Sequence, residues 1–209
     1  MRVTVFGAAG RTGRHLVTGA VARHHEVTAF VRRRDGAPQP PGVRLVEGDV
    51  ADPAAVRRAV AGRDAVICAL GAATPVRRDP TLVTGIRQII AAMTDAGVPR
   101  LVYLSFLGVP DGRRQLSALG RLAVAPILLR NVSADHAEKE ALIAASAVDW
   151  TIVRPPRLTD GPATGVYRHG TDIRATSVVP TISRADLARF MLDQLDTTEY
   201  VHCRPALMY

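Results

Sequence analysis

A glycine-rich turn near the start of the chain restricts the fold more than any other feature of the sequence. Arg2–Phe6 is an apolar, β-branched run, which is typical of a buried strand. Gly7, Gly10 and Gly13 come directly after this run, and the amphipathic pattern of a helix covers residues 11–23. A strand, a glycine turn and a helix in this order predict a parallel sheet whose strands are connected by crossover helices.

The rest of the chain repeats this alternation of short apolar runs and longer amphipathic stretches. We expect strands over residues 26–31, 43–47, 64–70, 100–105 and 150–153, and helices over residues 53–61, 81–96, 135–146 and 183–195. The length of 209 residues suits one domain, and the chain contains no internal repeat or linker. The sequence therefore predicts an α/β fold, a Rossmann-like doubly wound parallel sheet, in a single domain over residues 1–209.

The glycine turn has the properties of a phosphate-binding site. Glycine permits the tight bend and leaves room where a pyrophosphate meets the backbone, and the next helix offers unpaired N–H groups and a positive dipole end. Thr12 adds a hydroxyl donor and Arg11 adds a positive charge. The expected pyrophosphate-binding residues are Gly7, Ala9, Gly10, Arg11, Thr12 and Gly13. The alternative is a glycine-rich turn without a ligand.

The end of the second strand indicates which nicotinamide cofactor binds. NAD enzymes typically place Asp or Glu there, to accept a hydrogen bond from the ribose 2′-hydroxyl. This chain has Arg32, Arg33 and Arg34 instead. Guanidinium groups suit a 2′-phosphate through charge-assisted hydrogen bonds. The sequence thus predicts NADP(H), bound by Arg32 with Arg33 next to it; a solvated charge run is the alternative.

Two further strand ends supply expected contacts with the dinucleotide. Asp49 and Val50 come after the third strand, where they would bracket the adenine. Ala69, Leu70 and Gly71 come after the fourth strand, where a small, flexible turn lets the backbone approach the nicotinamide half. Because ligands of such sheets bind outside the carboxyl ends of the strands, these positions fit one extended dinucleotide.

A tyrosine–lysine pair for carbonyl reduction is absent from the sequence. In such a pair the tyrosine donates a proton, and a lysine four residues later lowers its pKa. None of the four tyrosines is followed by lysine at this spacing, and the only lysine, Lys139, has Asp135 four residues before it. Hydride transfer to an acceptor that takes its proton from water remains open, and flavins and other conjugated acceptors fit this description.

Composition argues against several classes of protein. The net charge is +8, but the arginines are scattered and aromatic residues make up 4% of the chain, whereas nucleic-acid binders concentrate charge and add aromatics for stacking. No apolar run reaches the roughly 18–20 residues of a membrane span. The chain enters a strand at once, so we expect no signal peptide. We expect a monomeric, cytoplasmic protein with a small-molecule substrate and no nucleic-acid or membrane partner.

Several segments make the chain similar to a known family. They are residues 5–13, 48–50, 61–67, 89–93, 135–136, 154–158, 165–167 and 182–192. On these segments the chain resembles the atypical short-chain reductases, whose NAD(P)-binding fold is shared with NmrA-like proteins. Within them it is most similar to the flavin reductases that also act on biliverdin-IXβ. The resemblance implies NADPH across the edge of the sheet, with an open, shallow pocket over the nicotinamide.

The resemblance also implies roles for three residues. Ser105, at the end of the fifth strand, would hydrogen-bond the nicotinamide carboxamide or the acceptor, and His136 would lie near the substrate mouth. Arg157 stands where the flavin reductases have histidine; it cannot shuttle a proton near neutral pH, but it can pair with a carboxylate or a phosphate. The simpler alternatives are a strand-end hydroxyl for Ser105 and a polar helix residue for His136.

These observations favour an NADPH-dependent reductase of free flavin or a similar conjugated acceptor, with Ser105, His136 and Arg157 as its catalytic residues. Two alternatives stay open. One is a non-catalytic redox sensor of the NmrA type, which binds dinucleotide and passes its state to a partner protein. The other is a reductase or epimerase of a secondary metabolite.

Overall fold

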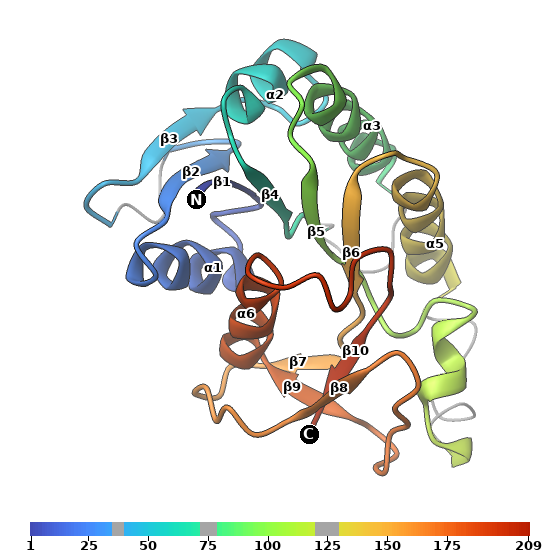
Figure 1. Cartoon of the computed structure of the whole chain (residues 1–209). Coiled ribbons are helices and arrows are strands. Elements are labelled where there is room, and N and C mark those ends of the chain that lie inside the picture. Colours follow the sequence, from blue (N-terminus) through green and yellow to red (C-terminus); the bar gives the residue numbers. More distant parts are fainter. Residues whose placement is uncertain (35–39, 72–78, 120–129) are drawn as a thin grey trace.

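Six parallel strands form the main sheet of the computed structural model, which describes residues 1–34, 40–71, 79–119 and 130–209 (Figure 1). Their order across the sheet is β3 (Arg44–Glu47), β2 (Glu26–Val31), β1 (Arg2–Phe6), β4 (Ala65–Cys68), β5 (Arg100–Leu104) and β6 (Asp149–Val153). The chain moves outward from β1 to β3, crosses back to β4 and then moves outward on the other side. This is the order of a doubly wound sheet, so the predicted Rossmann-like α/β fold is confirmed.

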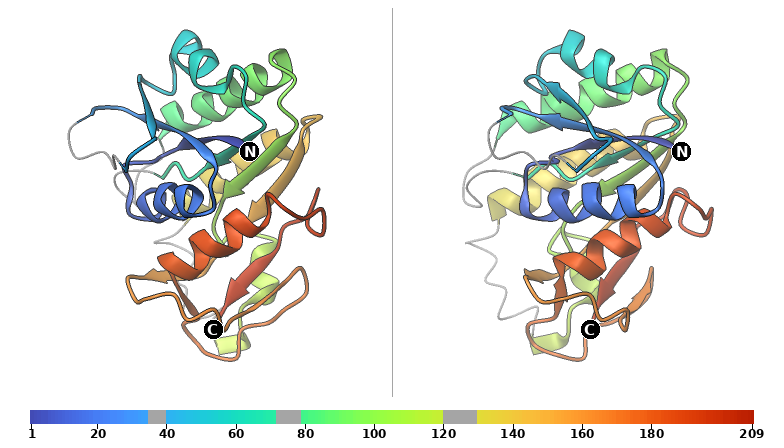
Figure 2. Two further views of the ribbon diagram at one scale, coloured as in Figure 1. Left: turned by 60° about the vertical axis from the view of Figure 1, so that its left-hand side comes forward. Right: turned by 90° about the vertical axis from the view of Figure 1, so that its left-hand side faces the viewer.

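Helices cover both faces of this sheet (Figures 1 and 2). One face is covered by α1 (Arg11–Ala22) and α6 (Arg184–Asp193), and the other by α2 (Pro53–Val60), α3 (Pro80–Asp95) and α5 (Arg130–Ala144). Each face has its own apolar cluster, as expected when the strands are buried on both sides. No helix in the described ranges has the length and apolar character that crossing a membrane requires.

The central strand shows how the sequence divides its side chains between the two faces. Val3 and Val5 belong to the apolar cluster under α1 and α6, whereas Phe6 belongs to the cluster under α2, α3 and α5. Thr4 lies on the same face as Phe6 because side chains alternate along a strand. Its buried hydroxyl donates a hydrogen bond of 2.6 Å to the carbonyl oxygen of Ala59. The strand is therefore buried on both faces without an unpaired hydroxyl.

Two small sheets beyond β6 were not expected from the sequence. β7 (Arg157–Thr159) pairs in parallel with β9 (Thr181–Ser183), and β8 (Arg168–Gly170) pairs antiparallel with β10 (Ala206–Met208). Each of these strands has three residues, which is too short for a recognisable alternation of apolar and polar positions. The structure also places the start of α5 at Arg130, five residues before the predicted start, and ends β4 at Cys68 rather than at residue 70.

The turn between β1 and α1 packs directly against the chain that leaves β4. Gly7 has φ of +78°, in the left-handed region that favours glycine, and a Cβ there would lie 2.5 Å from the carbonyl oxygen of Ala69. A Cβ on Gly13, in the first turn of α1, would lie 2.0 Å from the carbonyl oxygen of Gly7. At both positions only glycine leaves room for the neighbouring backbone. The start of α1 therefore packs directly against the turn.

We predict that Gly13→Ala destabilises the protein by about 1–3 kcal/mol or more, because its new methyl group would overlap the backbone of the turn. Gly161→Ala is the control, since no atom of the described residues, its chain neighbours aside, lies within 4 Å of a Cβ built there. Denaturant unfolding measures both effects. A similar loss of unfolding free energy in the two variants would show that close packing of the turn is not the cause.

Candidate functional site

Among the described residues, no side chain accepts a hydrogen bond from the start of α1. The N-cap is Gly10, which has extended backbone angles, and in the part of the chain that the structure describes no side chain caps this helix end. By contrast, Asp52 caps α2 by accepting from Ala54, and Asp79 caps α3 by accepting from Thr81. Exposed N–H groups and the positive end of the helix dipole favour an anion at the start of α1.

A cleft of about 320 Å³ opens from this turn across the carboxyl ends of the neighbouring strands. Its lining comes from the glycine turn, from the ends of β2, β3 and β4, and from α3. The lining residues are Gly7, Ala9, Gly10, Phe30, Val31, Arg32, Arg33, Gly48, Val50, Leu70, Gly71 and Leu82. Most of the predicted cofactor residues are thus brought together at the point where the strand order reverses, which is where doubly wound sheets bind ligands.

Arg32 and Arg33 are the positively charged residues of this cleft. Both side chains are exposed at the end of β2. Among the described residues neither has a carboxylate partner, whereas the next residue, Arg34, forms an ion pair of 3.3 Å with Glu47. Arg32 and Arg33 are therefore available to an anionic ligand in the cleft.

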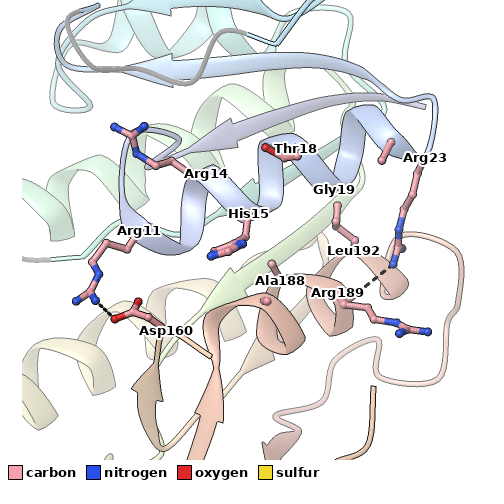
Figure 3. Close-up of a pocket in the computed structure, with 12 residues that line it drawn as sticks. Arg11, Arg14, His15, Thr18, Gly19, Arg23, Asp160, Ala188, Arg189 and Leu192 are labelled. Atoms are coloured by element: carbon pink, nitrogen blue, oxygen red, sulfur yellow. Dashed lines mark hydrogen bonds and ion pairs between the residues drawn. The ribbon is translucent and has the colours of Figure 1, made fainter. Parts of the chain in front are cut away.

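Arg11, predicted to contribute a charge at the turn, pairs elsewhere in the structure. Its guanidinium contacts Asp160 (Figure 3). Asp160 also pairs with Arg184, at 2.7 Å. The side chain lines a separate hollow of about 710 Å³ between α1 and α6, and no glycine of the turn lines this hollow. To bind a phosphate in the cleft, Arg11 would have to leave Asp160.

Three other predicted cofactor residues lie beside the cleft but are not among the residues that line it. Thr12 is buried in the first turn of α1. The carboxylate of Asp49 accepts a hydrogen bond of 2.8 Å from the backbone N–H of Ala51, so it holds the turn after β3. The backbone N–H of Ala69 donates to the carbonyl oxygen of Phe6 at 2.9 Å, which continues the pairing of β4 with β1 into the cleft wall.

Ser105 lies just beyond β5, the strand next to the cleft wall, and its hydroxyl is buried among charged groups. The hydroxyl donates a short hydrogen bond to Glu140 of α5, and Nδ1 of His136 lies 3.5 Å from the same oxygen. Glu140 in turn forms a two-pronged ion pair with Arg154, whose Nη2 also donates to Asp111 at 2.9 Å. The side chains of Glu140 and Arg154 are only 4% and 6% exposed.

A second buried ion pair lies on the same helix. Nζ of Lys139 is 2.6 Å from a carboxylate oxygen of Asp135, and the two side chains are 2% and 8% exposed. The sequence showed the spacing of these two residues but gave no sign that both are buried. Tyr103, on β5, is fully buried; its hydroxyl has no hydrogen-bond partner within the described ranges, and burial raises its pKa well above the ordinary value.

His136 is kept neutral by its surroundings. Burial lowers its pKa to about 3, and the positive charge of Lys139 acts in the same direction. The ring therefore carries no positive charge near neutral pH, and no imidazolium is present to act as a general acid.

Arg157 is the predicted site residue that the structure places away from these contacts. It begins β7, its side chain is exposed, and it is not among the residues that line the cleft. Its role toward an acceptor stays a prediction. Glu140, Arg154 and Asp111, in contrast, were missed, because only the fold brings them to Ser105 from three separate segments.

Comparison with known proteins agrees with this geometry. The 2-alkyl-3-oxoalkanoate reductase of Stenotrophomonas maltophilia is 35% identical over 176 residues, which is 78% of this chain and 52% of that protein, so the chain spans about half its length. A short-chain dehydrogenase/reductase of Veillonella parvula, solved in complex with NADP, has a TM-score of 0.83 at 17% identity, over 99% of this chain and 93% of its own. ChuY, an anaerobillin reductase of Escherichia coli O157:H7, has a TM-score of 0.79 at 24% identity, over 99% of this chain and 96% of its own.

The two solved structures establish the likeness of fold. The assignment of the family comes from a family model described as NAD(P)H-binding, which matches residues 7–198 and so begins at the first glycine of the turn. Since this match covers most of the chain, the protein belongs to the NAD(P)H-binding family.

Proposed function

We propose that the protein is an NADPH-dependent reductase that acts on free flavin or a similar conjugated acceptor. The observation that carries the proposal is the state of the polar groups around Ser105. The serine proton is held by Glu140, His136 is neutral, and Lys139 is paired with Asp135 in the interior. Among the described residues, this cluster therefore presents no acid to a ligand beside it.

An acceptor that needs no enzymic proton fits such a site. When bound, NADPH supplies a hydride, and a flavin or other extended conjugated system can take the accompanying proton from water. Reduction of an isolated carbonyl, as the name of the Stenotrophomonas relative describes, requires a donor beside the carbonyl oxygen. Among the described residues around Ser105, none is placed as such a proton donor, which favours the conjugated acceptor.

The residues of the cleft fit NADP(H) and have distinct tasks in the proposal. Gly7 and Gly10 leave the backbone open to the pyrophosphate at the uncapped start of α1. Arg32 and Arg33 bind the 2′-phosphate, and Leu70 and Gly71 form the wall beside the nicotinamide half. Ser105 lies next to that wall, at the end of the adjacent strand.

The first test is oxidation of NADPH by the purified protein, measured by its absorbance, with FMN, FAD and riboflavin as acceptors and NADH as the alternative donor. We expect turnover with NADPH. Arg32→Ala should raise the KM for NADPH about 10-fold or more, because it removes charge-assisted hydrogen bonds worth about 1.5–3 kcal/mol, and it should leave NADH nearly unaffected. Arg34→Ala is the matched control, since Arg34 pairs with Glu47.

Two results would contradict the proposal in different ways. Tight NADPH binding without turnover of any flavin would move the assignment to a redox sensor or to an enzyme of another substrate. An equal loss with NADPH and NADH in Arg32→Ala would show that Arg32 does not recognise the 2′-phosphate.

The neutral His136 gives a prediction for the pH dependence of stability. Its pKa in the folded protein, about 3, is below the value of about 6.5 in an unfolded chain. Below about pH 6.5 the unfolded state therefore binds one more proton at this residue, and the free energy of unfolding falls as the pH falls toward 3. The contribution is at most about 1.4 kcal/mol per pH unit. Denaturant unfolding of wild type and His136→Gln between pH 4 and 8 measures it: the variant should lose less stability on acidification, and parallel curves would refute the neutral state.

A further inference from the structure

We propose that Glu140 is the positioning residue of this site: it turns the hydroxyl of Ser105 into a hydrogen-bond acceptor for the carboxamide N–H of the nicotinamide. This inference rests on the proposed binding of NADP(H) in the cleft, and it deepens that proposal by naming the residue that orients Ser105. The question is in which direction the hydroxyl of Ser105 donates its hydrogen, and the chemistry of Glu140 and His136 determines the answer.

The contact between Ser105 and Glu140 fixes the position of the serine hydrogen. Oε1 of Glu140 accepts from the serine hydroxyl and also from Nε of Arg154 at 3.1 Å. Oε2 is bound by Nη2 of Arg154 and lies 3.5 Å from Nε of Arg204. Glu140 is thus the carboxylate partner of two guanidinium groups, and a carboxylate accepts hydrogen bonds but has no hydrogen to donate. The hydrogen between Ser105 and Glu140 is therefore the serine's own.

The contact between Ser105 and His136 leaves the serine with a free lone pair. Because the single serine hydrogen points to Glu140, Nδ1 of His136, 3.5 Å away, can approach the hydroxyl favourably only as an N–H donor. The ring is neutral, so Nε2 then has no hydrogen. Ser105 keeps a lone pair for a ligand, and a ligand group that meets it must offer an N–H or O–H. The carboxamide of nicotinamide carries such an N–H₂ group.

A conservative substitution separates this role of Glu140 from a purely structural one. Glu140 also balances the charge of Arg154, but Arg154 has a second partner in Asp111, with both carboxylate oxygens within 3.0 Å of its Nη2. In Glu140→Gln the amide oxygen would face Nη2 of Arg154, and the amide N–H₂, in the place of Oε1, would face Ser105 and Nε of Arg154. Ser105 would then accept from the glutamine, and its own hydrogen would become available to the ligand. This single substitution is expected to change the hydroxyl of Ser105 from an acceptor to a donor of the hydrogen bond with the ligand.

Two reduced cofactors that differ at one group test this directly: NADPH, and its 3-acetylpyridine analogue, in which a methyl group replaces the carboxamide N–H₂ and the carbonyl is kept. Isothermal titration gives both dissociation constants for each variant. In the wild type we expect the analogue to bind about 5-fold more weakly than NADPH, the effect of one lost hydrogen bond. In Ser105→Ala the ratio of the two constants should fall close to 1, and in Glu140→Gln it should fall as well or invert. Glu138→Gln, at an exposed position of the same helix, should keep the wild-type ratio.

The outcomes distinguish this inference from the function on which it rests. If the wild type does not bind NADPH, the proposed function and the inference are both overturned. If it binds NADPH but discriminates against the analogue no more than Ser105→Ala does, the role of Ser105 as acceptor is wrong while the proposed function stands. If the ratio is lost in Ser105→Ala but kept in a folded Glu140→Gln, Glu140 is not the positioning residue. If Glu140→Gln fails to fold, the comparison of wild type with Ser105→Ala still shows whether NADPH binds and whether Ser105 accepts a hydrogen bond from it.

Discussion

The close approach of the glycine turn to the end of β4 is the constraint on which the rest of the site depends. Gly7 meets the backbone at Ala69, and Gly13 meets the backbone of Gly7, at distances that leave no space for a Cβ at either glycine. This packing places the uncapped start of α1 at the point where the strand order reverses. The helix dipole, the open backbone of the turn and the ends of β2 to β4 then face one cleft.

Helix α5 contributes the buried charged residues that lie near Ser105. It carries both Asp135–Lys139 and Glu140, and all three side chains are almost completely buried. Buried ion pairs add little to net stability, because desolvation offsets their attraction. In the proposed function these charges have another task, because Glu140 sets the direction of the Ser105 hydrogen bond and Lys139 helps to keep His136 neutral. That arrangement suits the proposed acceptor, which needs no enzymic acid.

Features set by local pattern were predicted from the sequence, whereas contacts between distant segments were missed. The six main strands were expected from their apolar runs, and the cleft was expected from Gly7, Gly10 and Arg32, because in a parallel sheet strand ends gather at one edge. The pairing of Arg11 with Asp160 joins residues 149 positions apart, and the contact of Ser105 with Glu140 depends on how α5 packs beside the sheet. The spacing of residues along the sequence does not predict such contacts. The small sheets of β7 to β10 were missed because three-residue strands have no readable period.

We propose that the dinucleotide binds at the turn between β1 and α1, and hydrogen exchange of backbone amides with and without NADPH locates its binding site. At a saturating concentration of NADPH, we predict slower exchange at residues 8–13 and 69–71. Exchange should be unchanged in α6, which borders the hollow on the other side of α1. Slower exchange confined to the α1–α6 hollow, or no change at the turn, would contradict binding at the turn.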